Sequence, residues 1–169
     1  MLGRTSLSLG ALSLAVVALA ACGGSASHTL PTTPSGRPAA VGIASTGIGN
    51  VLVDQQGRTL YRFGRDSGTM SACTGACAAN WPPFRIHGKP AVGSGAKVSD
   101  VGTTTRPDGR SQLTYDGHPL YTFVNDKNPG DTNGEGVKAF GGSWFAVSAS
   151  GAEVAPASKP QGGSGYGGY

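Results

Sequence analysis

The sequence predicts an all-β fold in which two tandem, pseudo-equivalent antiparallel β units form one small domain with at most one short helix. Two observations support this prediction. Glycine contributes 29 of the 169 residues, proline contributes 11, and only 13% of residues are charged, a composition typical of short strands joined by many turns. The second observation is an internal duplication, in which residues 60–66 (LYRFGRD) recur as residues 120–126 (LYTFVND) at a spacing of 60.

The duplication extends beyond these segments. Gly57 matches Gly117 at the same spacing of 60, whereas Trp81 is matched by Trp144 at a spacing of 63, which indicates three extra residues in the second copy. Two copies of one supersecondary unit are the natural interpretation. The predicted domain spans residues 41–155, with a first repeat at about 45–95 and a second at about 96–155.

Each repeat is predicted to begin with a β-hairpin. In the first repeat, the alternation at Val51 and Val53 indicates a half-buried strand that runs into a turn at Gly57. In the second repeat, Leu113 and Tyr115 alternate in the same way. The two hairpins are therefore expected to be structurally equivalent.

The second hairpin has the clearer turn signal. Asp116-Gly117 is a strong tight-turn pair, and it leads into a predicted strand at 120–123. Because side chains alternate along a strand, Tyr121 and Phe123 are expected to share one face, with Leu120 on the other.

The remaining elements follow from proline and glycine. The helical candidate is 74–80, which stops before Pro82. Residues 81–86 contain two prolines, so this segment is expected to be extended or to lie at a sheet edge. A last strand is predicted at 144–148, ending before Gly151.

The N-terminus has the pattern of a bacterial lipoprotein signal peptide. Arg4 supplies a positive charge, residues 7–19 are apolar, and two alanines precede Cys22. We expect residues 1–21 to be removed and Cys22 to carry lipid, since two acyl chains hold a protein at a bilayer more firmly than one. An ordinary secretory signal is the alternative. The predicted location is the outer face of the cytoplasmic membrane, with the lipid bilayer as a partner.

Low-complexity segments flank the predicted domain. Residues 22–40 contain too few large apolar side chains to fold, so they are predicted to form a disordered tether. Residues 156–169 are predicted to form a Gly-rich tail. The formal net charge of +4 arises from basic residues without a dense run, so nucleic acid is not an expected partner.

Two YxFxxD motifs, each followed by a tryptophan, stand out in the repeats: Tyr61, Phe63, Asp66 and Trp81 in the first, and Tyr121, Phe123, Asp126 and Trp144 in the second. With these motifs the chain resembles the bacterial secreted-repeat lipoproteins known by a YxFxxD motif, over about residues 45–151. The resemblance implies a surface-anchored, all-β repeat protein of uncharacterised function. It transfers no catalytic residues.

The repeated motif has two interpretations. The Tyr and Phe rings are expected to form a shared core while each Asp caps a turn through its carboxylate. Alternatively, the six aromatic residues of the motifs form an exposed platform that stacks sugars or other cell-wall components. Solvent exposure of the rings separates the two interpretations.

The cysteines also leave alternatives open. Outside the cytoplasm, Cys73 and Cys77 are expected to pair in a structural disulfide. The alternative is a redox or copper-handling site, in which Met70 and His87 join the two thiols as soft sulfur and imidazole ligands.

A polar loop in the second repeat suggests a further metal site. Asp126, Asp131, Asn133 and Glu135 place oxygen side chains in a glycine-rich segment, but Gly142 stands where an EF-hand has its bidentate glutamate. A surface loop is the expected structure, with calcium binding as the alternative. No cofactor is expected, and copper and calcium stay as alternatives.

Catalytic motifs are weak in this chain. There is no nucleophile elbow, Walker loop or dinucleotide fingerprint. The favoured function is a non-catalytic binding or envelope-interaction module with an unknown surface ligand or protein as its partner. A hydrolase acting on the envelope is the weakest alternative, since it needs two converging carboxylates, for which the candidates are Asp54, Asp66, Asp116 and Asp126.

Overall fold

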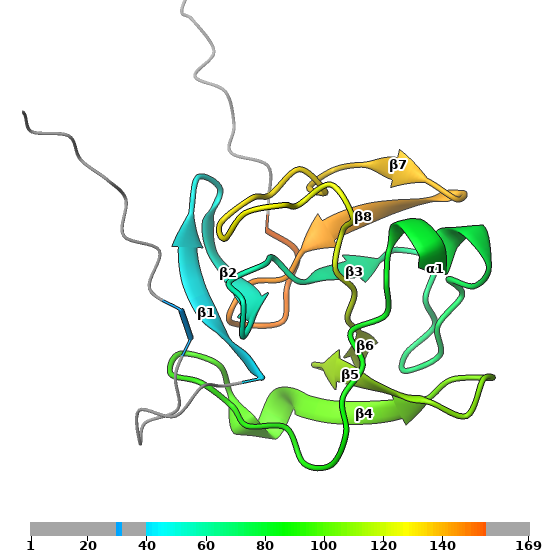
Figure 1. The fold of residues 1–169 in the computed structure, drawn as a ribbon, viewed down its shortest axis with the longest axis horizontal. Coiled ribbons are helices and arrows are strands. Elements are labelled where there is room, and N and C mark those ends of the chain that lie inside the picture. Colours follow the sequence, from blue (N-terminus) through cyan, green and yellow to red (C-terminus); the bar gives the residue numbers. More distant parts are fainter. Residues whose placement is uncertain (1–29, 32–39, 155–169) are drawn as a thin grey trace, which may run out of the picture.

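The computed structural model describes residues 30–31 and 40–154 (Figure 1). The predicted signal peptide, the predicted lipidation site Cys22, most of the predicted tether and the predicted tail from residue 156 lie outside the described residues. In the part of the chain that is described, no helix has the length and apolar character needed to span a bilayer.

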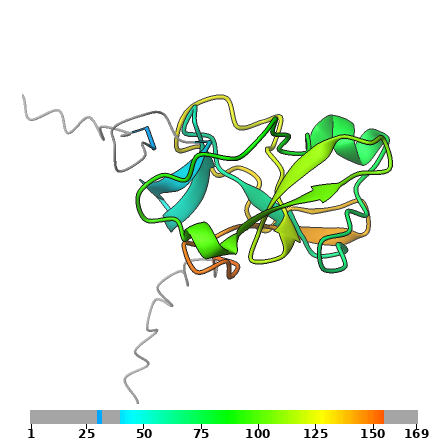
Figure 2. The ribbon, with the colours of Figure 1, turned by 90° about the horizontal axis from the view of Figure 1, so that it is seen from below.

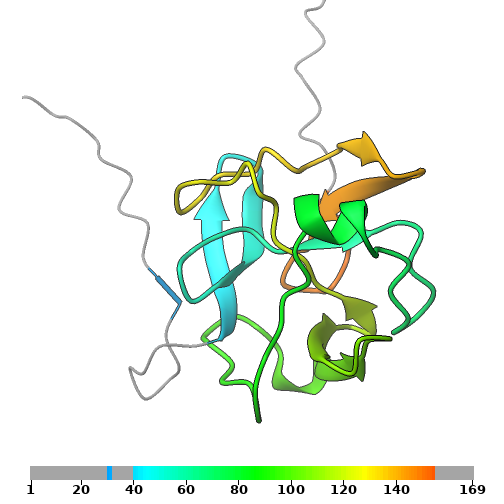
Figure 3. The ribbon, with the colours of Figure 1, turned by 45° about the vertical axis from the view of Figure 1, so that its right-hand side comes forward.

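The described chain is mostly β. Its elements are β1 (Val41–Thr46), β2 (Gly49–Asp54), β3 (Tyr61–Phe63), α1 (Ala76–Asn80), the 3-10 helix η1 (Val98–Asp100), β4 (Val101–Thr105), β5 (Ser111–Tyr115), β6 (His118–Pro119), β7 (Lys138–Ala139) and β8 (Gly142–Ala146). The strands form three small antiparallel sheets with the orders β1-β2, β3-β8-β7 and β4-β5-β6. The all-β prediction is therefore confirmed, and α1 lies inside the segment 74–80 that was expected to be helical. In Figure 3, α1 is seen between the β7–β8 hairpin and β6.

The predicted tight turn between β5 and β6 is present. Asp116 and Gly117 both have positive φ, 48° and 74°, as a type I′ turn requires. Two further strands were not predicted from the sequence: β1 pairs with β2, and β4 pairs with β5, along their whole lengths.

The two repeats exchange their last extended segments. Strand β3 of the first repeat pairs with β8 of the second, with Tyr61 opposite Ala146 and Phe63 opposite Trp144. In the equivalent place, the proline-containing segment of the first repeat pairs with the second, through an antiparallel bridge between Pro83 and Tyr121. Each repeat thus completes the sheet of the other.

Backbone hydrogen bonds repeat the same junction twice. At each of the two places, three residues bond to one another through three backbone N–H···O bonds. One lies in a hairpin strand (β2 or β5), one directly precedes the motif tyrosine, and one lies in the segment contributed by the other repeat. The first set joins Leu52 to Val147, Val147 to Leu60 and Leu60 to Leu52; the second joins Leu113 to Phe84, Phe84 to Leu120 and Leu120 to Leu113. The lengths of these six bonds lie between 2.7 and 3.1 Å.

The two repeats are related by a pseudo-twofold axis that passes between Tyr61 and Tyr121. The backbone N–H of Tyr61 donates to the carbonyl of Tyr121 at 2.8 Å, and the reverse bond is 2.9 Å. The exchanged strands and this central pair mean that the two sequence repeats form one folding unit.

Two apolar clusters lie on the two faces of the motif strands. The aromatic core consists of Val51, Val53, Tyr61, Phe63, Cys73, Cys77, Trp81, Tyr121, Trp144 and Ala146. The aliphatic core consists of Val41, Leu52, Leu60, Leu113, Tyr115, Leu120 and Val147. The alternation expected from the sequence is therefore present, but both faces of the motif strands are buried.

Candidate functional site

Four rings of the repeated motifs stack in one column inside the aromatic core. The order is Phe63, Trp144, Trp81 and Phe123, with ring centroids 4.2, 3.9 and 4.1 Å apart and interplanar angles of 11°, 3° and 18°. Each tryptophan therefore stacks on the phenylalanine of the other repeat. Offset aromatic pairs of this kind add about 0.5–1.5 kcal/mol each beyond their buried area.

The tyrosine of each repeat donates a hydrogen bond to the aspartate of the other. The Tyr61 hydroxyl lies 2.6 Å from Oδ2 of Asp126, and the Tyr121 hydroxyl lies 2.7 Å from Oδ2 of Asp66. Through its other oxygen, each aspartate accepts a backbone N–H from its own loop. The motif aspartates cap their loops, as expected, and they also cross-link the repeats.

Five of the six motif rings are buried, and Phe123 is partly buried. Tyr61, Tyr121 and Trp144 are 0% exposed, Trp81 is 1% exposed and Phe63 is 3% exposed. The exposed aromatic platform would need these faces in solvent. The geometry instead matches the interpretation of a shared core.

The buried phenols lead to a prediction for alkaline pH. Burial raises the pKa of Tyr61 and Tyr121 far above the ordinary value, and the neighbouring aspartate of each adds to the shift. A raised pKa favours the neutral phenol in the folded state, so this contribution to stability is intact below about pH 10 and is lost as the pH rises above it. In a base titration, two tyrosines are expected to ionise together with unfolding.

Tyrosinate absorbance and far-ultraviolet circular dichroism, followed in the same titration, measure this coupling. The variants Tyr61→Phe and Tyr121→Phe are each expected to remove one phenolate from the unfolding step. Ionisation of these two tyrosines while the dichroism stays native would contradict their buried, hydrogen-bonded position.

The structure joins Cys73 and Cys77 in a disulfide, with an S–S distance of 1.97 Å and a Cα–Cα distance of 5.2 Å. The predicted pairing is thus confirmed. Both residues are buried, at 0% and 6% exposure. Loop-closure entropy for so short a loop corresponds to about 2 kcal/mol of stabilisation.

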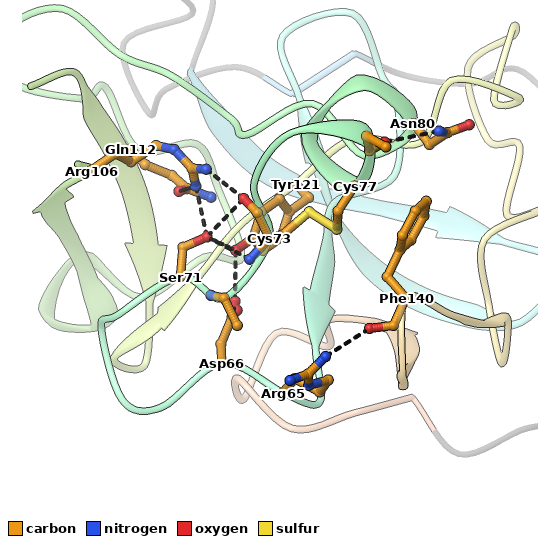
Figure 4. Close-up of a disulfide and its surroundings, with 12 residues drawn as sticks. Arg65, Asp66, Ser71, Cys73, Cys77, Asn80, Arg106, Gln112, Tyr121 and Phe140 are labelled. Atoms are coloured by element: carbon orange, nitrogen blue, oxygen red, sulfur yellow. Dashed lines mark hydrogen bonds between the residues drawn. A yellow bond between two sulfur atoms is a disulfide. The ribbon is translucent and has the colours of Figure 1, made fainter. Parts of the chain in front are cut away.

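A buried arginine lies beside this disulfide (Figure 4). Arg106 is 6% exposed and donates to Oγ of Ser71 at 2.8 Å, to Oε1 of Gln112 at 2.6 Å and to the carbonyl of Cys73. The hydroxyl of Tyr121 contacts the same Ser71 oxygen at 2.7 Å. The guanidinium therefore ties the disulfide loop to β5. Sequence reasoning missed this network, because nothing in the sequence relates Arg106 to a loop more than thirty residues earlier.

The four predicted copper ligands are not gathered in one place. Met70 is 68% exposed and lines a hollow with Pro107, while His87 lines a different cleft with Arg110. The two cysteine sulfurs are bonded to each other.

Three of the four predicted calcium ligands accept backbone N–H groups, and the side-chain amide of Asn133 donates to Oδ1 of Asp126. Oδ2 of Asp131 accepts the N–H groups of Lys127 and Asn128, each at 2.8 Å. Oδ1 of Asp126 accepts the N–H of Asn133, and Oε2 of Glu135 accepts an N–H from β8 at 2.6 Å. Over residues 40–154, no group of three or more His, Cys, Asp or Glu side chains is arranged to hold a metal ion.

Three of the four candidate hydrolase carboxylates have separate partners. Asp54 is 0% exposed and pairs with Arg58 at 2.7 Å. Asp66 and Asp126 accept the hydroxyls of different tyrosines, and Asp116 lies in the exposed turn after β5. Asp54, Asp66 and Asp126 therefore each have a structural role of their own.

A polar cleft of about 560 Å³ lies where the segment after the two prolines meets the turn between β4 and β5. Its lining residues are Arg85, Ile86, His87, Gly88, Gly109, Arg110 and Ser111. We call it the Arg85–Arg110 cleft. The two segments are held together by a bridge between Arg85 and Gln112 and by an ion pair of 3.0 Å between Arg85 and Asp108.

The cleft has a positive electrostatic environment. The pKa of Asp108 lies below its usual range, first because its carboxylate accepts the backbone N–H of Arg110, and also because the charges of Arg85, Arg110 and Arg106 are near. Anionic oxygens are favoured where several cations and a backbone N–H converge. Asp108 already accepts from Arg85 and from the N–H of Arg110, so the guanidinium of Arg110 is the group that can hold a further carboxylate or phosphate.

Two neighbouring hollows extend this surface. One, of about 270 Å³, is lined by Ala40, Gln55 and the segment 84–91 without Gly88, and the other, of about 330 Å³, by Lys89, Val98 and residues of β4. We call the exposed side chains that line these three hollows, together with Lys97 next to Val98, the basic face: Arg85, His87, Lys89, Lys97, Val98 and Arg110. Figure 2 shows η1 and the segment that leads to it toward the viewer, beside β1.

Charge is unevenly distributed over the domain. Of the residues that the structure describes, the segment 85–110 contains five of ten Lys and Arg but two of nine Asp and Glu. The sequence analysis found the basic residues spread along the chain without a dense run. The fold brings Arg85 and Arg110 to one cleft and places Lys89 in the lining of the two adjoining hollows, whereas Arg106 is buried beside the disulfide.

Comparison with known proteins agrees with the duplication. One family, described as a secreted repeat of unknown function, matches the chain at residues 42–85 and again at 102–148. The two matches correspond to the two repeats and together cover more than half of the chain. No curated protein and no solved structure gives a significant match.

Proposed function

Since the chain belongs to the family of secreted repeats of unknown function, we propose that it is an extracytoplasmic, non-catalytic binding module whose Arg85–Arg110 cleft takes an anionic group. We further propose that lipid on Cys22 holds it at the outer face of the cytoplasmic membrane. The observation that carries the proposal is the concentration of exposed cationic side chains around the cleft.

The scaffold supports binding more than catalysis. The aromatic motif residues pack in or against the core, and the motif aspartates accept the cross-repeat hydrogen bonds from the tyrosines. The cleft contains two guanidinium groups and an imidazole but no carboxylate pair in its lining. Guanidinium groups bind carboxylate and phosphate oxygens through paired hydrogen bonds. Such a lining suits recognition of an anion.

The redox alternative rests on Cys73 and Cys77. Their burial and the bond from Arg106 to the carbonyl of Cys73 oppose it, because a partner thiol reaches a buried sulfur only after the loop opens. The membrane anchor is supported by the residues around Cys22, which have the order that a lipoprotein signal requires.

Short-chain polyphosphate is the probe for the cleft, with binding followed by backbone amide shifts in nuclear magnetic resonance. We expect the largest shifts at Gly88, Gly109 and Arg110, which line the cleft. The variant Arg110→Gln is expected to weaken binding by about tenfold, since a charged hydrogen bond is worth about 1.5–3 kcal/mol. The matched control is Lys138→Gln, which removes an exposed cation from β7.

If Arg110→Gln and Lys138→Gln weaken polyphosphate binding equally, binding depends on the net charge of the domain and not on the cleft. Shifts that fall elsewhere on the domain would reject the cleft as the binding site.

A further inference from the structure

We propose that the basic face docks the domain onto the anionic phospholipid headgroups of the membrane that carries the anchor. This inference rests on the proposed function for its lipid anchor and for the chemistry of the cleft. It adds the partner: a bilayer surface, contacted by cations and one exposed apolar side chain together. The argument has three steps, which concern the tether, the position of the face and its composition.

The tether leaves the domain earlier than the start of β1. Pro31 is buried, and a Cβ placed on Gly42 of β1 would lie 2.2 Å from its Cβ. Leu30 packs near Gly57 in the turn between β2 and β3. The chain is thus held against the domain at residues 30–31, so only the segment from Cys22 to Leu30 separates the domain from the lipid.

The length of that segment limits the distance to the membrane. Eight residue steps span at most about 28 Å when fully extended. A domain of this size has a radius of gyration of about 13 Å and hence a diameter of about 34 Å. The gap to the bilayer is therefore smaller than the domain itself, and a face of the domain can reach the headgroups.

The basic face adjoins the side from which the tether leaves. Ala40, where the domain begins, lines one hollow together with Arg85, Lys89 and Gln55, and Gln55 lies two residues from the Leu30 contact at Gly57. The N–H of Ala40 also donates to Ala91 at 2.9 Å. A domain held to the surface at Leu30 can thus present this face to the bilayer.

The composition of the face matches a membrane interface. Val98 is 70% exposed in η1, although it is an apolar residue. It lines a hollow with Lys89, and Lys97 precedes it with 60% of its side chain exposed. An exposed apolar residue among cations is the pattern by which peripheral proteins insert between headgroups while binding their phosphates.

Two acidic groups moderate the charge of the face without cancelling it. Asp108 pairs with Arg85, and Asp100 lies 3.7 Å from Lys97. Within the described part of the chain, neither Lys89 nor Arg110 forms an ion pair with a carboxylate. The attraction is therefore expected to be modest and to act over about one Debye length, about 10 Å at 0.1 M salt.

Vesicle co-sedimentation tests the inference with the complete mature chain carrying Cys22→Ser, exported behind a leader that adds no lipid. Binding is expected to vesicles of phosphatidylglycerol and phosphatidylcholine, to decrease with salt, and to be absent with phosphatidylcholine alone. The double variant Lys89→Glu/Lys97→Glu is expected to weaken binding by at least about tenfold, because each cation near an anionic surface contributes about fivefold. Lys127→Glu/Lys138→Glu reverses two exposed cations elsewhere and is expected to change it little.

At high salt, where charge effects are screened, a third variant, Val98→Asp, is expected to weaken vesicle binding more than Lys89→Glu/Lys97→Glu does. The inference is overturned if the wild-type protein ignores the anionic vesicles, or if both double variants lose binding equally. In either case, polyphosphate binding that still depends on Arg110 would leave the proposed function standing. Absence of both vesicle binding and Arg110-dependent polyphosphate binding would reject the cleft as an anion site and the basic face as a docking surface.

Discussion

Either repeat produced alone, as residues 40–95 or 96–154, is expected to be unfolded, although each contains a complete sequence repeat. The reason is the strand exchange, because β3 of the first repeat pairs with β8 of the second and Pro83 pairs with Tyr121. A separated repeat loses half of the ring column and its partner for the motif tyrosine. Below about 60 residues, a chain with half a core does not offset its conformational entropy.

Far-ultraviolet circular dichroism and amide dispersion in nuclear magnetic resonance measure the outcome directly. An equimolar mixture of the two fragments is expected to recover native dispersion in a concentration-dependent way, since the exchanged strands then find their partners. The matched control is the uncut two-repeat domain, diluted over the same concentration range, whose native dispersion is expected not to depend on concentration. A single repeat that folds at low concentration would contradict the exchanged topology.

Much of the fold could be predicted from the sequence because the duplication is nearly exact where it matters. The motif at 61–66 recurs at 121–126 with the same spacing of Tyr, Phe and Asp, and local rules then place the Asp116-Gly117 turn and the short helix α1. These features depend on neighbouring residues. They need no knowledge of what packs against them.

The strands β1 and β4 escaped the sequence analysis because they lack an apolar pattern. In β4 the residues are Val, Gly and three threonines, and in β1 small residues interrupt the alternation. Their pairing with β2 and β5 comes from the hairpin register rather than from side-chain periodicity. Propensity in strands is mostly a statement about packing, and here the packing is long-range.

The candidate site was the least predictable part. The strand exchange, the Tyr–Asp bonds between repeats and the bonds from Arg106 to the disulfide loop all join residues more than thirty positions apart. The basic face likewise arises from the loop that follows the exchanged segment, so its cations meet only in the folded chain. A single sequence contains the residues of this face but no sign that they converge.

Replacing Trp144 with alanine is expected to lower the free energy of unfolding by about 4 kcal/mol, the usual range for a fully buried tryptophan being about 3–5 kcal/mol. The indole is 0% exposed and lies in the middle of the ring column, 3.9 Å from Trp81 and 4.2 Å from Phe63. Domains of this size are stable by about 5–15 kcal/mol in total. The variant is therefore expected to be largely destabilised near physiological temperature.

Urea denaturation of the wild type, Trp144→Ala, Trp81→Ala and the double variant measures this effect. The pseudo-twofold relation predicts similar losses for the two single variants, and the double variant is expected to cost less than their sum, because each substitution removes the same stacked pair. Phe140→Ala is the matched control: Phe140 lies at the tip of the same β7–β8 hairpin but is 40% exposed. A loss for Phe140→Ala as large as that for Trp144→Ala would mean that the ring column is not the main support of the fold, and the exposed aromatic residue would then need an explanation of its own.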